Sequence, residues 1–573
     1  MGLKYRINGW VKGILNWRIA DAITTWYVNI SPAYRRSFWI SFIIINVVFC
    51  VHTANFLFGN HDFSSLFGDI VWFRMAMEGR FFNTLPYALW GNNLLPVANN
   101  VGGFFCMVLG GTIFCRLFHC REKTLCLICG TLLLVLPPYI CSVLYYSKMF
   151  FSVSWIFALV PMVFLLLERP NIIKLIFASL MVCVCLGIYQ SCVAMFGVTA
   201  LALVMVECVE FRLERPWYKN SVLKRFAAYV IAIIVGCGLY MLVLYYLRKN
   251  GILKVDSYNL QTVGLSELPA RIWPTFENAV KSMTVGQIYM PAFYKYIMIA
   301  VMALGWLSVA MRIWKRPEHC RCISYIMSVL FKLLIIVACG VVMFFLIEFS
   351  SFVAKAKIMY TLRVLIYSVP PLLLVGYLLT CRYGAKVVQN IVFCLVIIIL
   401  WRSVIGDFAF QKNLKLGTDI EFMTYQRILS MIEQDPRMLK RVKSRTLVEI
   451  GLPDNFRERF VAPWLSERPS PSIGCDVELF RYSFNPTWSG NTGQPFKFLS
   501  DRINYGDSYC VPSGSCSKLY QNFKNNKEIM AFLAQAQSWP APAEKCLFVN
   551  DKYVIVVLHP TSLRKFKDEL EKY

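Results

Sequence analysis

Long apolar runs constrain the fold of this chain more than any other feature. About 20 apolar residues are needed to cross roughly 30 Å of hydrocarbon, and runs of about that length recur over the first 405 positions. There are eleven, at residues 37–57, 99–118, 124–142, 150–168, 172–190, 191–209, 226–246, 292–311, 329–348, 364–380 and 387–405. Hydrophobic residues make up 57% of the chain and charged residues only 16%, which excludes an ordinary soluble protein. The sequence therefore predicts a polytopic α-helical membrane protein with about eleven transmembrane helices.

Basic residues gather in alternate links between these runs. With a cytoplasmic N-terminus, the cytoplasmic links carry the excess of Lys and Arg that membrane proteins place on that side. These residues are Arg116, Arg121, Lys123, Arg169, Lys174, Arg212, Arg215, Lys219, Lys224, Arg225, Arg312, Lys315, Arg316, Arg321, Arg382 and Lys386. The net charge of +26 thus follows from membrane orientation, and no nucleic-acid partner is expected.

The same pattern predicts three parts. Residues 1–36, with basic residues among tryptophans, are expected to form an amphipathic segment on the cytoplasmic face. Residues 37–405 form the transmembrane domain. Residues 406–573 form a soluble domain on the opposite face of the membrane. The outer loops at 58–98, 247–291 and 349–363 lie on that same face. The apolar 247–291 loop suggests a re-entrant or interfacial helix, or a plain lid.

The residues after 406 predict a small mixed α/β domain. Acidic residues on a helical pattern come first, and strand-like runs follow at 446–451, 546–549 and 553–558, with Asn550-Asp551 as the turn between the last two. Four cysteines lie here, at positions 475, 510, 516 and 546, and Cys510 with Cys516 is the expected pair if disulfides form. The cysteines in the apolar runs are expected to be packing residues, and no metal site is predicted from cysteines.

The first outer loop begins with Asn60-His61-Asp62 directly after the first run, so these groups lie at the membrane boundary. A carboxylate there can take the proton from an acceptor hydroxyl as it attacks a sugar C1 whose leaving group is a lipid phosphate. Arg80, later in the loop, can hold that phosphate and stabilise its growing charge. The alternative is an ordinary solvated loop in which acids and arginines form ion pairs.

Two further outer positions can bind ligand. Tyr189-Gln190 lies where two runs meet, and there a phenol and an amide can bond sugar hydroxyls or a phosphate oxygen, or can simply tie two helices together. Arg363 opens another run, with Lys357 close before it. These cations can hold the phosphate of a polyprenyl carrier, or Arg363 can be an arginine extending from a helix end to the interface.

A set of short motifs resembles a known family. They are Asn60-His61-Asp62, Gly79-Arg80, the stretch 187–191 (GIYQS), the stretch 359–363 (MYTLR), and the segment 411–433 with Asp419 and Tyr425-Gln426-Arg427-Ile428. Their order and common sidedness resemble the bacterial O-antigen glucosyltransferases, the serotype-converting and lipid-dependent membrane enzymes. The resemblance extends over roughly residues 40–435.

The resemblance implies the C-type membrane glycosyltransferase fold, an undecaprenyl-phosphate-linked sugar donor and a glycan acceptor at the periplasmic face of the bacterial inner membrane. Asp62 is then the expected base. Arg80, Arg363 and Lys357 are the expected phosphate ligands, and Asn60, His61, Tyr189 and Gln190 the expected sugar contacts. Family members often carry two adjacent acids where this chain has Asp62-Phe63, so Asp69 or Glu78 is the candidate second acid. A carboxylate pair would bind Mg²⁺ or Mn²⁺, whereas a single base needs no metal.

We therefore expect transfer of a hexose, glucose in that family, from a polyprenyl phosphate to a lipid-linked or surface glycan. A transporter or flippase of lipid-linked glycans is the alternative, and a structural scaffold is a third reading. A transporter predicts ionisable residues along a path through the bilayer, and these are scarce within the apolar runs. Motifs of soluble nucleotide and hydrolase enzymes are absent from the sequence.

Overall fold

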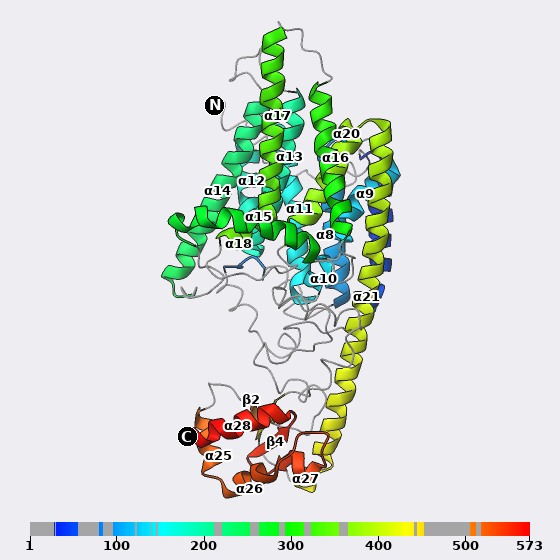
Figure 1. The fold of residues 1–573 in the computed structure, drawn as a ribbon. Helices are drawn as coiled ribbons and strands as arrows, with labels where there is room; N and C mark the ends of the chain where they lie inside the picture. Colours follow the sequence, from blue (N-terminus) through cyan, green and yellow to red (C-terminus); the bar gives the residue numbers. More distant parts are fainter. Residues whose placement is uncertain are drawn as a thin grey trace, which may run out of the picture.

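Helices dominate the computed structural model, and a small sheet follows them (Figure 1). It describes residues 28, 30–55, 79–83, 96–120, 123–137, 139–144, 147–210, 221–252, 263–285, 293–314, 322–353, 365–439, 444–451, 505–511 and 517–572.

The helical part covers α3 (Pro32–Val48), α4 (Cys50–Ala54), α8 (Pro96–Leu117), α9 (Thr124–Val135), α10 (Tyr139–Leu144), α11 (Ser147–Leu166), α12 (Ile172–Ile188), η1 (Gln190–Cys192), α13 (Val193–Glu210), α14 (Ser221–Lys249), η4 (Leu265–Glu267), α15 (Leu268–Val285), α16 (Tyr294–Trp314), α17 (Cys322–Phe345), η6 (Leu346–Glu348), α18 (Phe349–Val353), α20 (Val369–Tyr383) and α21 (Lys386–Glu433). Among the described residues, seven helices are long and apolar enough to cross a membrane: α8, α11, α13, α14, α16, α17 and α21. This is the architecture of a polytopic helical membrane protein. The predicted count of eleven spans stays a prediction, because α9, α12 and α20 are shorter apolar helices of 12, 17 and 15 residues.

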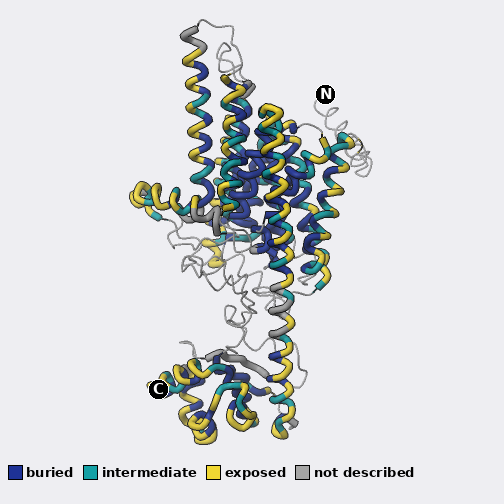
Figure 2. The backbone as a smooth tube through the Cα atoms, turned by 45° about the vertical axis from the view of Figure 1, so that its right-hand side comes forward, coloured by how far each residue is buried: buried dark blue, intermediate teal, exposed yellow. Residues whose placement is uncertain are grey.

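Apolar side chains lie both inside and outside the helix bundle. Figure 2 shows buried residues where the helices face one another and exposed residues on their outward faces. On α14, Leu242 and Tyr245 are 66% and 67% exposed, and on α17 Leu334 is 65% exposed. Helices that are apolar all round need an apolar surround, which a bilayer provides and water does not.

Glycines allow close helix contacts inside the bundle. On α16 and α20, Gly305 and Gly376 face each other, and a Cβ on Gly376 would lie 2.7 Å from the Cα of Met302. Lipid tails are as apolar as the helices, so tight packing at small residues is what holds such pairs together. These contacts make α16 and α20 a closely packed pair.

Two predicted spans end differently from expectation. The run at 124–142 is not one helix: α9 ends at Val135 and α10 begins at Tyr139, because the intervening Pro137-Pro138 cannot supply helical N–H donors. The run at 387–405 does not end where the apolar residues end. Instead α21 continues for 48 residues to Glu433, about 72 Å at the helical rise, so the last span and the following acidic helix are one element.

The outer loop predicted at 247–291 contains a helix, as expected. α15 runs crosswise to the upright helices at their lower ends, beside α18 (Figure 1). Its Ile272 and Trp273 side chains are 48% and 77% exposed. An amphipathic helix lying across helix ends has the geometry of an interfacial helix.

The C-terminal part begins with η7 (Pro436–Leu439) and contains β1 (Arg445–Ile450), β2 (Tyr505–Val511), α25 (Ser517–Lys524), α26 (Lys527–Gln535), α27 (Ala543–Cys546), β3 (Leu547–Val549), β4 (Tyr553–Val557) and α28 (Pro560–Lys572). The strand order is β2-β1-β4-β3, with β1 parallel to β2 and β4, and β3 antiparallel to β4. The strands predicted at 446–451, 546–549 and 553–558 and the turn at Asn550-Asp551 are confirmed. The location of this part in solution outside the membrane stays a prediction.

Helices cover both faces of this sheet. One face packs Val448, Ile450 and Ile555 against α25, α26 and α28. The other packs Leu447 and Val554 against the end of α21, through Tyr425, Ile428, Leu429 and Ile432. Cys546 is a buried free thiol. Cys475, Cys516 and the side chain of Cys510 lie outside the described residues, so the predicted pairing of Cys510 with Cys516 stays a prediction.

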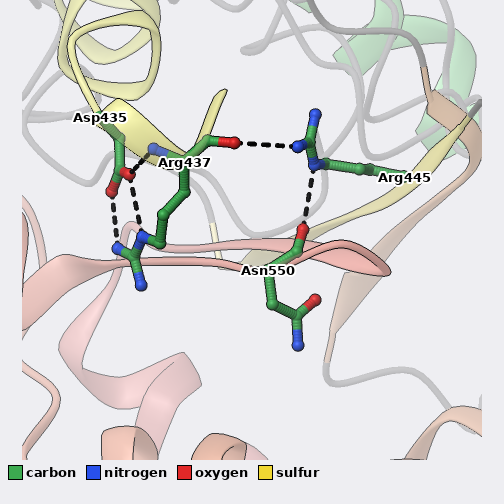
Figure 3. Close-up of polar contacts among 4 residues, drawn as sticks. All are labelled: Asp435, Arg437, Arg445 and Asn550. Atoms are coloured by element: carbon green, nitrogen blue, oxygen red, sulfur yellow. Dashed lines mark hydrogen bonds and ion pairs between the residues drawn. The ribbon is translucent and has the colours of Figure 1, made fainter. Parts of the chain in front are cut away.

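An ion pair and hydrogen bonds from Arg445 lie where the end of α21 meets the sheet (Figure 3). Arg437 donates from Nε and Nη2 to the Asp435 carboxylate at 2.9 and 2.6 Å, and these bonds hold the pKa of Asp435 below its usual value. Arg445 on β1 donates to the carbonyls of Arg437 at 3.0 Å and Asn550 at 2.9 Å. The long helix therefore ends in a fixed relation to the central strand and to the β3–β4 turn.

Candidate active site

The structure describes three of the residues predicted to act: Arg80, Tyr189 and Gln190. The others lie outside the described residues: Asn60, His61, Asp62, Asp69, Glu78, Lys357 and Arg363. The described residues therefore show how the end of the first outer loop contacts the junction between α12 and α13.

Two segments about 100 residues apart in sequence dock against each other. The Phe82 N–H donates to the Gly187 carbonyl at 2.9 Å, which attaches the short segment 79–83 to the last turn of α12. Gly187 permits this approach, because a Cβ there would lie 2.6 Å from Phe82 and 2.8 Å from Phe81. The segment 79–83, blue in Figure 1, lies near the ends of α12 and α14 that face the C-terminal sheet. Two motifs singled out in the sequence thus form one structural unit.

Arg80 lies over the ring of Tyr189. The guanidinium carbon is 4.5 Å from the ring centroid, a cation–π contact that orients the arginine while it stays half-buried. Tyr189 is 7% exposed and packs at 5.7 Å between centroids on Tyr367, which in turn stacks on Phe157 of α11 at 5.4 Å. A row of buried rings therefore supports the Arg80 guanidinium.

Tyr240 of α14 closes the other side of this unit. The Gln190 amide nitrogen donates to the Tyr240 hydroxyl at 3.0 Å, and that hydroxyl donates to the Gly79 carbonyl at 3.3 Å. Gly79 has φ +75°, a left-handed conformation that glycine adopts readily, so the turn before Arg80 depends on it. Tyr240 also stacks on Phe81 at 5.7 Å. We call these residues, Gly79–Phe82 with Gly187, Tyr189, Gln190 and Tyr240, the Arg80 cradle.

Both interpretations of Tyr189-Gln190 apply to this geometry. Gln190 ties η1 to α14 through Tyr240, as the structural alternative expected. It is also half-buried beside Arg80, so a ligand at the cradle would meet the amide and the guanidinium together. What the arrangement offers is a positively charged, oriented donor group at one end of the helix bundle, which suits an anionic ligand such as a phosphate.

Sequence reasoning missed Tyr240, Tyr367 and Asn83. Tyr240 lies in the same apolar run as Tyr245 and Tyr246. Tyr240 is 4% exposed, whereas Tyr245 and Tyr246 are 67% and 63% exposed, and nothing in the sequence pattern distinguishes the three. Asn83 is 4% exposed and accepts a hydrogen bond from Ser152 of α11, which anchors the far end of the segment. Only the polarity of Asn83 after Phe81-Phe82 was a usable signal.

A metal site is not assembled from the part of the chain that the structure describes: no three His, Cys, Asp or Glu side chains there are placed to hold an ion. The acids that would bind Mg²⁺ or Mn²⁺, Asp62 with Asp69 or Glu78, lie outside it.

Comparison with protein families decides the identity. The model of the family described as "Glucosyl transferase GtrII" matches residues 60–380, more than half of the 573-residue chain. The chain belongs to the GtrII glucosyl transferase family. The match begins at Asn60 and includes both segments of the Arg80 cradle. Neither the curated proteins nor the solved structures include a significant match.

Membership in the GtrII family makes this chain a membrane glucosyl transferase, an enzyme that uses a sugar donor and a glycan acceptor, and it supports a place in O-antigen modification. The resemblance drawn from the short motifs is confirmed. All of α21, which carries the motif at 411–433, and the C-terminal sheet lie beyond the matched residues.

Proposed function

We propose that this GtrII family member transfers glucose from a polyprenyl-phosphate-linked donor to an O-antigen or related lipid-linked glycan, at the periplasmic face of the inner membrane. The observation that carries the proposal is the Arg80 cradle: a partly buried arginine whose guanidinium lies over Tyr189, at the end of the bundle from which α21 leaves toward the C-terminal sheet. A lipid phosphate at the membrane boundary is the anion that such a site would meet.

The chemistry is a single displacement. The acceptor hydroxyl oxygen attacks C1 of the glucosyl group, the bond from C1 to the phosphate oxygen breaks, and the hydroxyl proton passes to the Asp62 carboxylate. The polyprenyl phosphate leaves with one more negative charge, which Arg80 would stabilise together with Arg363 and Lys357. Gln190, Tyr189, Asn60 and His61 would contact sugar hydroxyls or phosphate oxygens. One displacement of this kind inverts the configuration at C1.

Transfer in membranes that contain the full chain tests the base. With polyprenyl-phosphoglucose as donor, Asp62→Asn should lower kcat by about 100-fold to 10,000-fold, the range for loss of a general base. Asp568→Asn, at an exposed position on α28, is the matched control and should leave kcat unchanged. Full transfer by Asp62→Asn would refute the assignment.

The donor contact has its own test. Arg80→Lys keeps the charge but loses the planar fork and the stacking on Tyr189, so the KM for donor should rise about tenfold. Sealed vesicles of both orientations, given donor and acceptor from outside, locate the site. Transfer only where the periplasmic face is outward supports the proposal, and transfer only in the opposite orientation contradicts it.

Chelation tests whether transfer needs a divalent cation. Loss of transfer in EDTA, restored by Mg²⁺ or Mn²⁺, would assign an ion to Asp62 with Asp69 or Glu78. Unchanged transfer would assign Asp62 as a base that acts alone.

A further inference from the structure

The first apolar run breaks at a residue that does not break helices. α3 ends at Val48 and α4 begins at Cys50, with Phe49 between them at φ −100° and ψ 21°. Sharp kinks arise at proline, at Gly and Ser pairs, at π-bulges, or where a side chain enters the backbone hydrogen-bond ladder. The sequence from Ile45 to Ala54 contains neither proline nor glycine.

A glutamine from the last span enters the ladder at this point. In a continuous helix the His52 N–H would donate to the Val48 carbonyl. Here the His52 N–H donates to Gln411 Oε1 at 3.0 Å, and Gln411 Nε2 donates to the Val48 carbonyl at 2.7 Å. The side-chain amide therefore replaces one helical hydrogen bond with two, one on each side of the break. Gln411 Nε2 also lies 3.1 Å from the carbonyl of Asp407, one turn earlier on α21.

The surroundings of this bridge are dry. Gln411, Asp407 and Phe49 are fully buried, and His52 is 2% exposed. Cys141 of α10 donates to Asp407 Oδ1 at 3.2 Å, so α4, α10 and α21 meet here. Water cannot substitute for a lost partner in such a place, and unsatisfied backbone groups are strongly unfavourable inside a membrane protein. Gln411 satisfies a donor and an acceptor at once, which neither an apolar residue nor a carboxylate can do.

The bridge joins α4, the element that precedes the proposed base, to α21, the element that packs against the C-terminal sheet. α4 ends at Ala54, and Asn60-His61-Asp62 follows within eight residues. α21 runs on from Gln411 to pack against the C-terminal sheet. We propose that Gln411 is a positioning residue that holds the kink of the first span and thereby sets where α4 delivers the base Asp62; the inference rests on the proposed function.

Two substitutions separate bridging from simple packing. Gln411→Leu removes both bonds and should lower kcat for transfer by about 100-fold, the effect of displacing a catalytic group by about 1 Å, with little change in the donor KM. Gln411→Glu restores the bridge only when protonated, because only then does it donate to Val48 as well as accept from His52. Gln411 is fully buried, and burial disfavours the charged form of a carboxyl, so the bridge should form at about pH 5.5, where the kcat of Gln411→Glu should exceed that of Gln411→Leu by about tenfold.

The titratable groups around the bridge are His52 on α4, Asp407 on α21 and Cys141 on α10. Their titration is present in the wild type as well, so each variant is compared with wild type at the same pH. Ser403→Ala is the matched control: Ser403 is equally buried on α21 but bonds only within its own helix, to the Ile399 carbonyl. A Gln411→Glu kcat equal to that of Gln411→Leu at every pH overturns the proposal.

Amide hydrogen exchange of the full chain gives a measurement that needs no sugar. Peptides that cover Cys50–Ala54 should exchange faster in Gln411→Leu than in wild type or Ser403→Ala. Unchanged exchange overturns the inference even if kcat falls. A wild type that transfers no glucose would instead refute the proposed function, while the exchange experiment would still decide whether Gln411 holds α4.

Discussion

Replacing Gly187 by alanine should disable the Arg80 cradle without touching any residue that contacts substrate. The added Cβ would lie 2.6 Å from Cδ2 of Phe82, and 2.8 and 3.0 Å from two ring atoms of Phe81. Carbon atoms in contact are ordinarily 3.5–4.0 Å apart, so the two rings must withdraw by about 1 Å. The rings are held by the Phe82 hydrogen bond to the Gly187 carbonyl and by stacking on Tyr240, so they cannot withdraw without moving Arg80.

A displacement of about 1 Å in a charge-stabilising group reduces rate by about 100-fold. We therefore expect Gly187→Ala to lower kcat/KM for glucosyl transfer by about that factor, which corresponds to about 2.7 kcal/mol. The assay is transfer from polyprenyl-phosphoglucose by purified full-length protein in lipid, normalised to folded protein by thermal unfolding.

Gly238→Ala is the matched control. Gly238 is on α14, two residues before Tyr240, and a Cβ there would meet nothing within 4 Å. This variant should keep full activity and gain slightly in helix stability, by up to about 1 kcal/mol. If Gly187→Ala retained wild-type kcat/KM, the docking of segment 79–83 on α12 would not determine the position of Arg80, and the role assigned to the cradle would be wrong.

Two further predictions concern Tyr240 and the C-terminal sheet. Tyr240→Phe removes the hydroxyl that accepts from Gln190, so kcat/KM should fall about tenfold or more; Tyr377→Phe, whose hydroxyl bonds a carbonyl elsewhere in the bundle, should leave it unchanged. Burial raises the pKa of the Glu449 carboxyl well above its usual value, so the sheet should lose stability as pH rises from the ordinary value of 4.5 toward the raised one, because only the unfolded state releases the proton. Glu449→Gln should abolish this loss of stability, so that hydrogen exchange of the β1 amides no longer accelerates with pH beyond the intrinsic rate. Glu544→Gln, at an exposed site, is the control and should retain the loss. Equal behaviour of the two variants would contradict the reasoning.

Several elements could be predicted because they depend on neighbouring residues alone. Whether a helix is stable in lipid or in water depends on its own composition, so the apolar runs predicted a membrane protein without reference to tertiary contacts. The junction between the runs at 172–190 and 191–209 and the turn at Asn550-Asp551 likewise follow from the local sequence, and both are confirmed. The short motifs led to the correct family because their order in the chain is itself a sequence property.

The tertiary structure alone decided how these pieces meet. Helices that are apolar all round have no pattern that reveals which face is buried, so Tyr240 could not be distinguished from Tyr245 before packing was known. For α21, the sequence predicted a span to residue 405 and a helical pattern after it, but only the structure shows that the two are one helix, which contacts α4 and packs on the sheet. Gln411 is the clearest case, because its partners Val48 and His52 lie about 360 positions earlier, and only a folded bundle brings that amide into the kink of the first span.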